Sequence, residues 1–133
     1  MFWTGVFKKG EAMAKKILVV DDEDDMLSVM DLRLTSTGYD VVLAENCQQA
    51  MARFREERPD LVMLDIMLPD GNGFDLCQKI KQENPHGVKI IMFTNKVQAI
   101  DVARARQAGA DDFIVKTSDL VFILDAITKV LKD

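Results

Sequence analysis

Four short apolar runs of this sequence each end in polar side chains that can take part in chemistry. These side chains are Asp21, Asp22, Asp65, Thr94 and Lys116. Two carboxylates about 4 Å apart repel by roughly 4 kcal/mol at an effective dielectric constant of 20, so a cluster of three needs a cation. Oxygen ligands without histidine or thiolate favour a hard ion, and Mg²⁺ that keeps some of its water suits a site with few protein ligands.

The same side chains could also hold a phosphoryl group. Lys116 supplies a positive charge and Thr94 a hydroxyl donor. A carboxylate can attack phosphorus and form an aspartyl phosphate when the charge around it is neutralised. Asp65 is the best placed nucleophile, because it follows what is predicted to be the central strand. The expected reaction is an in-line transfer, catalysed by positioning and by the electrostatics of the metal.

Each of these residues also has a simpler structural interpretation. An acidic run such as residues 21–25 is usually a solvated loop, and Asp24 or Asp25 is predicted to cap the following helix. A single aspartate, threonine or lysine after an apolar strand is usually structural. Their joint appearance at four strand ends favours a common site.

The elements that must position these residues follow from an alternation of apolar runs and amphipathic segments. Strands are predicted at residues 17–20, 40–44, 61–64, 88–93 and 112–115. Most are nearly all apolar, which is typical of buried parallel strands, and the less apolar second one is expected near an edge. Because crossovers are right-handed, the predicted fold class is α/β, a (βα)5 doubly wound parallel sheet of flavodoxin-like order 2-1-3-4-5. Ligands of such sheets bind beyond the carboxyl ends of the strands.

Local signals mark several helix ends. Asn46, with Gln49 three residues later, resembles a capping box, and Ser118 is expected to cap the last helix. Gly38 and Gly109 stand where helices should end, at the position where a left-handed backbone costs glycine least.

Composition narrows the possible functions. The 133 residues are 48% hydrophobic and 29% charged, which predicts one folded domain, at residues 15–133, after a flexible or added N-terminal extension at residues 1–14. The net charge of -5 argues against direct contact with nucleic acid. No apolar run reaches the roughly 18 residues of a membrane span, so we expect a cytoplasmic protein without a membrane partner. Cys47 and Cys77 lack metal-like spacing and are expected to be reduced, partly buried thiols.

Four segments together resemble the receiver domains of bacterial response regulators, over residues 15–133. They are KKILVVDDEDD, PDLVMLDIMLPDGNGFDLC, KIIMFTN and AGADDFIVK. The resemblance implies a signalling switch that accepts a phosphoryl group from the phosphohistidine of a sensor histidine kinase or a phosphotransfer protein. It implies a phosphoacceptor domain, a monomer or weak dimer, and no turnover of external substrates.

The resemblance also implies a role for each site residue. Asp65 would be the phosphoacceptor. Asp22 would bind Mg²⁺ directly, Asp21 would help through water, and the backbone carbonyl of Met67 would be a further ligand. Lys116 would pair with the phosphoryl oxygens.

The same likeness describes how the signal would spread. Thr94 would be the switch hydroxyl, and Phe113 the aromatic side chain that turns inward behind it. The surface formed by the fourth helix, fifth strand and fifth helix would then change and regulate an unknown downstream partner. An ordinary core aromatic is the alternative for Phe113.

Three residues depart from the family pattern. Thr117 replaces the usual proline after Lys116, and a cis bond before a non-proline costs about 3 kcal/mol, so this bond could be trans. Asn95 stands where a small residue is common, and Asn72 where an aspartate is common. None of these changes removes a reacting group.

Two other functions compete with a phosphorylated switch. Haloacid dehalogenase-type enzymes also use an aspartate nucleophile with Mg²⁺, but they place a second aspartate two residues later, where this chain has Met67. The second alternative is a receiver-like interaction module that signals without phosphate. Titration with beryllofluoride and Mg²⁺ separates the switch from the module.

Overall fold

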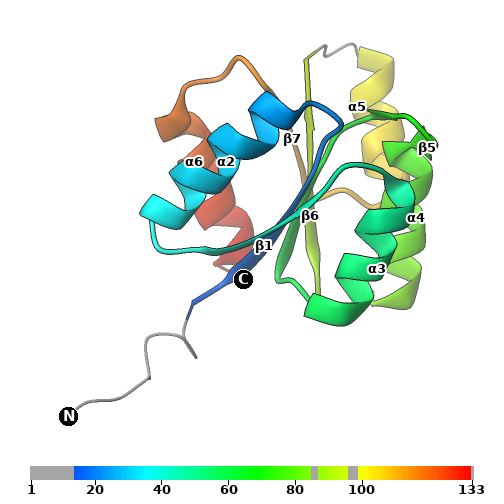
Figure 1. The fold of residues 1–133 in the computed structure, drawn as a ribbon. Coiled ribbons are helices and arrows are strands. Elements are labelled where there is room, and N and C mark those ends of the chain that lie inside the picture. The colour runs from blue at the N-terminus through cyan, green and yellow to red at the C-terminus, as the bar shows by residue number, and fades with distance from the viewer. Residues whose placement is uncertain (1–13, 85–86, 96–98, 133) are drawn as a thin grey trace.

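The computed structural model describes residues 14–84, 87–95 and 99–132. They form a five-stranded parallel sheet with helices on both faces (Figure 1). In spatial order the strands are β2 (Asp40–Ala44), β1 (Lys16–Val20), β3 (Leu61–Leu64), β6 (Lys89–Thr94) and β7 (Asp112–Val115). This is the predicted order 2-1-3-4-5, and the second strand of the chain lies at an edge as expected. The fourth strand lies one residue later than predicted.

Five helices cover the sheet in the described part of the chain. Figure 1 shows that they lie on both faces. The first face carries α2 (Asp24–Ser36) and α6 (Leu120–Leu131), and the second carries α3 (Cys47–Glu57), α4 (Gly73–Glu83) and α5 (Ala99–Gln107).

Each face of the sheet has its own apolar core. Ile17 and Val19 belong to the cluster on one face, whereas Leu18 and Val20 belong to the cluster on the other. All four are at most 1% exposed. Burial on both faces explains why the strands read as nearly continuous apolar runs. Each such side chain contributes roughly 1.5–3 kcal/mol through its removal from water.

Several predicted helix ends are confirmed. The Asn46 side chain accepts a hydrogen bond from the Gln49 N–H at 2.8 Å, and the Gln49 side chain turns back to the N–H of Glu45 at 2.9 Å. Gly38 and Gly109 have φ angles of 107° and 97° and lie two residues after the last residue of α2 and of α5, as their glycine identity predicts.

The predicted cap of the last helix is wrong by one residue. Asp119 is the N-cap of α6, and its side chain makes no capping hydrogen bond. Ser118 is part of the preceding turn, where its N–H donates to the carbonyl oxygen of Val115 at 3.0 Å. The turn after β7 therefore delays the helix by one position.

The predicted cap of the first helix is also wrong. Glu23 is the N-cap of α2, and its side chain accepts no capping hydrogen bond. Its carboxylate is instead bonded to Lys116. Asp24 and Asp25 lie inside the first turn, where their charges interact favourably with the helix dipole.

A small hairpin not predicted from the sequence follows β3. It consists of β4 (Met67–Leu68) and β5 (Gly71–Asn72), which pair in antiparallel fashion. The turn residues Pro69 and Asp70 connect its two short strands. Among the described helices, none combines the length and apolar character needed to cross a membrane.

Candidate functional site

Main-chain pairing brings the predicted site residues to one edge of the sheet, at the top in Figure 1. Asp21 directly follows β1. The N–H of Asp65 donates to the carbonyl of Val20 at 3.1 Å, and the N–H of Lys116 donates to the carbonyl of Thr94 at 2.8 Å. Parallel strands in register thus place the ends of β1, β3, β6 and β7 side by side. The predicted site residues thus lie at the edge where ligands of such sheets usually bind.

The ammonium group of Lys116 is at the centre of the site. Its Nζ lies 2.6 Å from Asp21 Oδ2, 2.9 Å from Glu23 Oε1 and 3.0 Å from Asp65 Oδ2. The contacts with Glu23 and Asp65 are hydrogen bonds. The contact with Asp21 Oδ2 is an ion pair without hydrogen-bond geometry, so that buried oxygen has no hydrogen-bond partner among the described residues.

This arrangement shifts the pKa of Lys116 and that of Asp21. Burial alone lowers the pKa of Lys116, but the close contact with the Asp21 carboxylate and the hydrogen bonds that Lys116 donates to Glu23 and Asp65 outweigh burial and raise the pKa well above its ordinary value. Burial raises the pKa of Asp21, against the opposing influence of Lys116. The lysine is therefore charged at neutral pH and offsets the cost of burying carboxylates beside it.

Asp65 is held by both of its carboxylate oxygens. Oδ1 accepts a hydrogen bond from the N–H of Ile66 at 2.7 Å, and Oδ2 accepts one from Lys116 at 3.0 Å. The residue is buried but its side chain keeps 11% of its surface accessible. A small reactant can therefore reach a carboxylate whose orientation is already fixed.

Three carboxylates converge beside this lysine. One oxygen each from Asp21, Asp22 and Asp65 lies within 4.8 Å of the other two. Asp22 is exposed, whereas the other two are buried. All-oxygen donors at this spacing fit a hard divalent cation such as Mg²⁺, and Asp21 Oδ2 has no hydrogen-bond partner among the described residues. The predicted role of the Met67 carbonyl stays a prediction.

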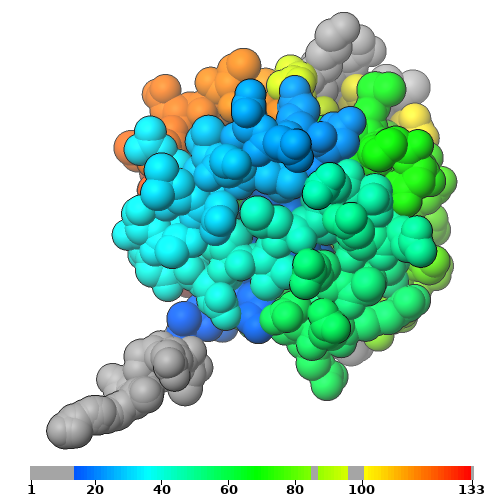
Figure 2. Space-filling model, viewed as in Figure 1, coloured from blue at the N-terminus to red at the C-terminus, as the bar shows by residue number. Residues whose placement is uncertain are grey.

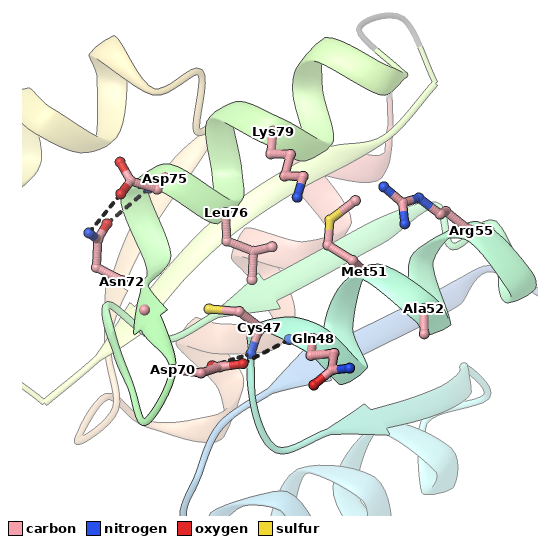
Figure 3. A pocket seen from close by; sticks show the side chains of 11 residues that line it. Cys47, Gln48, Met51, Ala52, Arg55, Asp70, Asn72, Asp75, Leu76 and Lys79 are labelled. Atoms are coloured by element: carbon pink, nitrogen blue, oxygen red, sulfur yellow. Dashed lines mark hydrogen bonds between the residues drawn. The ribbon is translucent and has the colours of Figure 1, made fainter.

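The loop that carries Asp65 is pinned at both ends. The N–H of Gly73 donates to the carbonyl of Ile66 at 2.6 Å. The carboxylate of Asp70 accepts hydrogen bonds from Cys47 N–H at 2.7 Å and from the next N–H of α3 at 3.0 Å (Figure 3). The N–H of Cys47 is the main reason why the pKa of Asp70 lies below its usual value. The start of α3 therefore fixes the loop after Asp65 from outside the site.

A cavity of about 570 Å³ lies between α3 and α4, on the other side of that loop (Figure 3). Met51 and Leu76 contribute to its apolar lining, with Arg55 and Lys79 near one end. None of the predicted site residues lines it. The cluster around Lys116 is thus identified by its charged side chains, because it does not line this cavity.

Cys47 lines this cavity, and we expect its thiol to react slowly with alkylating reagents. Both cysteines are free, and burial, followed by the Asp70 charge, raises the pKa of the Cys47 thiol to about 11. At pH 8 we expect iodoacetamide to alkylate Cys47 roughly a hundredfold more slowly than glutathione, because the thiolate is the nucleophile. The rate should rise about tenfold per pH unit until about pH 11.

Peptide mass spectrometry after timed labelling measures this rate. Cys77 is the internal control: it is fully buried, its pKa is also raised to about 11, and it should react only when the protein unfolds. Labelling of Cys47 at the glutathione rate would contradict the raised pKa.

The departures from the family pattern are accommodated in the described residues. No peptide bond there is cis, so Lys116 and Thr117 are joined by a trans bond. Asn72 is the N-cap of α4: its side chain accepts from Asp75 N–H at 2.9 Å and donates to the Asp75 carboxylate at 3.0 Å. An aspartate could not make the second bond, which gives asparagine a structural reason at this position. Asn95 is exposed.

The two predicted switch residues lie on neighbouring strands. Thr94 is buried at the end of β6, opposite Val115 of β7. Phe113 is half-buried, packs against the core of the α3, α4 and α5 face, and lines a surface cavity of about 350 Å³ with Val102 and Arg106. Its position is compatible with both interpretations given above.

Two contacts of the site were not predicted from the sequence. In the sequence Glu23 is one member of an acidic run, and its position two residues after Asp21 is the signal that places it near the site. The N–H of Ile66 cannot be recognised from residue type, since every residue except proline carries one.

The geometry defines a doubly wound α/β domain whose carboxyl edge holds a cluster of carboxylates around a buried lysine. Comparison with known proteins agrees with this class. A family model described as the response regulator receiver domain matches residues 17–128. The chain belongs to the response regulator receiver domain family, a family of phosphorylation-based two-component signalling switches.

Individual relatives show the extent of the likeness. The DNA-binding response regulator MtrA of Mycobacterium tuberculosis is 40% identical over 106 residues, which are 80% of this chain and 46% of that protein. The chain thus spans about half the length of the curated relatives it matches.

Solved structures extend the likeness to the fold. A CheY-like receiver domain protein of Methanospirillum hungatei superposes with a TM-score of 0.85 at 32% identity, over 90% of this chain and 94% of that chain. The BeF₃-activated receiver domain of Klebsiella pneumoniae RstA gives 0.84 at 28% identity, over 90% and 100%.

Proposed function

We propose that this domain accepts a phosphoryl group on Asp65 from the phosphohistidine of a sensor histidine kinase or a phosphotransfer protein, with Mg²⁺ as cofactor. The observation that carries the proposal is the convergence of three carboxylate oxygens within 4.8 Å beside the Lys116 ammonium. Such a pocket has both the anionic ligands for a metal and the cation for a phosphoryl group.

The chain's own residues would perform the transfer by positioning. A carboxylate oxygen of Asp65 attacks phosphorus as the phosphorus–nitrogen bond to the donor histidine breaks, and the nitrogen keeps the electron pair of that bond. Lys116 moves from the carboxylates to the phosphoryl oxygens, and the Thr94 hydroxyl donates to another. The Ile66 N–H holds Asp65 in place during the attack.

The cation would be held by Asp22 and Asp65 directly, by Asp21 through water, and by the backbone carbonyl of Met67. When bound, Mg²⁺ would neutralise the charge that builds up on the transferring phosphoryl group. Lys116 already opposes part of the repulsion between these carboxylates through its contacts with Asp21 and Asp65.

Phosphorylation would be transmitted from Thr94 to Phe113. A shift of Thr94 toward the phosphoryl group would leave space behind it for Phe113, and the surface of α5, β7 and α6 would change. That surface would regulate a downstream partner, by as much as phosphorylation favours the active conformation.

We propose that residues 15–133 form this receiver domain of a cytoplasmic protein, as a monomer or weak dimer. The name of the relative MtrA states DNA binding, and that statement concerns a protein about twice as long as this chain. With a net charge of -5, this chain itself is not expected to grip nucleic-acid phosphates.

The test of this proposal is phosphorylation by a small donor. We expect acetyl phosphate with Mg²⁺ to add the mass of one phosphoryl group, seen by intact-protein mass spectrometry, and excess EDTA to prevent the addition. An unchanged mass with Mg²⁺, in a protein shown to be folded by circular dichroism, would favour the phosphorylation-independent module.

A further inference from the structure

The third carboxylate on Lys116 comes from Glu23, a residue without an assigned role in the transfer. Glu23 Oε1 accepts a hydrogen bond from Lys116 Nζ at 2.9 Å. The main chain supports this contact, because the N–H of Glu23 donates to Asp21 Oδ1 at 2.9 Å. Figure 2 shows the segments after β1, in blue, and after β7, in orange, side by side at the top of the molecule.

The three carboxylates that contact Lys116 differ in how much free energy is lost when the contact breaks. The side chain of Asp21 is 1% exposed and that of Asp65 is 11% exposed, whereas that of Glu23 is 53% exposed. A buried carboxylate that loses its cation is left uncompensated at a large cost. A half-exposed carboxylate is rehydrated when its ion pair breaks, and the loss is small.

A phosphoryl group has to compete with three carboxylates for Lys116. The ammonium group donates hydrogen bonds to Glu23 and Asp65, and Asp21 Oδ2 lies 2.6 Å from the same Nζ. A phosphoryl oxygen that approaches Nζ therefore displaces one of these carboxylates. Glu23 is the partner whose release costs least, and its negative charge would also repel an incoming phosphoryl group.

We propose that Glu23 is a positioning residue that holds Lys116 while Asp65 is unphosphorylated and releases it when a phosphoryl group arrives. The inference rests on the proposed function. Glu23 is separate from the predicted metal ligands: the oxygens that converge within 4.8 Å belong to Asp21, Asp22 and Asp65. Its removal should therefore change binding of the phosphoryl group and leave binding of the metal unchanged.

Beryllofluoride, an analogue of the phosphoryl group, provides the measurement. In the Glu23→Gln variant we expect the affinity for beryllofluoride at saturating Mg²⁺ to rise roughly threefold to fivefold, because a half-exposed ion pair no longer competes. The affinity for Mg²⁺ alone should stay within about twofold of the wild type. The gain should shrink in high salt, which screens exposed charges. Titrations followed by NMR give both affinities.

Asp24→Asn is the matched control. It removes the same charge from the next residue, which in the described part of the chain makes no ion pair with Lys116. We expect the wild-type beryllofluoride affinity in this variant. Glu23→Asp keeps the charge with a shorter reach, and should give a gain smaller than that of Glu23→Gln.

Several results would overturn the proposed role of Glu23. An equal gain in Asp24→Asn would make the effect one of general charge and overturn the role of Glu23. Unchanged or weaker beryllofluoride binding in Glu23→Gln, or a parallel loss of Mg²⁺ affinity, would also overturn it while the proposed function stands. Absence of beryllofluoride binding in the wild type would overturn both. Urea unfolding checks that each variant is folded.

Discussion

Asp65→Asn should abolish phosphorylation by acetyl phosphate, with no mass increase at any time at which the wild type is fully modified. The amide has no carboxylate oxygen that can attack phosphorus, and it removes one of the three negative ligands expected for Mg²⁺. The fold should survive, because the side chain is nearly isosteric and Lys116 keeps its ion pairs with Asp21 and Glu23. Intact-protein mass spectrometry makes the comparison.

Asp60→Asn is the control for this experiment. Asp60 precedes the same strand, β3, at its opposite end, where its carboxylate accepts a hydrogen bond from the N–H of Lys16 at 2.8 Å. This variant should be phosphorylated like the wild type. Phosphorylation of Asp65→Asn to the wild-type extent would show that the acceptor is another residue.

Gly73→Ala is expected to have the second largest effect, on both stability and phosphorylation. A Cβ at this position would overlap the backbone carbonyl oxygen of Asp65 and stand 3.0 Å from Ile66 Cα. Neither atom can yield easily, because Asp65 is bonded to β1 through its N–H and Gly73 is bonded to Ile66. We expect a loss of about 3 kcal/mol in the free energy of unfolding, measured with urea.

The same substitution should slow phosphorylation roughly a hundredfold, since a displacement of about 1 Å in a catalytic group has an effect of that size. Gly71→Ala is the matched control in the same loop. Its Cβ would meet only the Cys47 sulfur at 3.1 Å, at the end of a side chain. This variant should lose little stability and keep its phosphorylation rate. Similar behaviour of the two variants would contradict the backbone collision.

Sequence alone was sufficient for the fold and for most of the site. The strands could be recognised because both faces of the sheet are buried, so that runs such as Leu61–Leu64 are apolar throughout. The order of the strands followed from right-handed crossovers. Since parallel strands end at one edge, the sequence pattern places Asp21, Asp65 and Lys116 together.

What sequence could not reveal depends on tertiary contacts. Side-chain type is the signal for a helix cap, but Glu23 stands at the N-cap of α2 without a capping hydrogen bond, and its carboxylate contacts Lys116, 93 residues away in the chain. The hydrogen bond from the Cys47 N–H to the Asp70 carboxylate joins residues 23 positions apart, and local sequence patterns likewise do not predict it. Such contacts between loops require the fold to be known first.

The most direct test of the central claim is a crystal structure of the protein with Mg²⁺ and beryllofluoride. We expect beryllofluoride on an Asp65 carboxylate oxygen, contacted by Lys116 and Thr94, and Mg²⁺ beside it with Asp22 as a direct ligand. Beryllofluoride bound at any other residue, or Mg²⁺ bound away from the three carboxylates, would contradict the proposal that these side chains form one phosphoryl-accepting pocket.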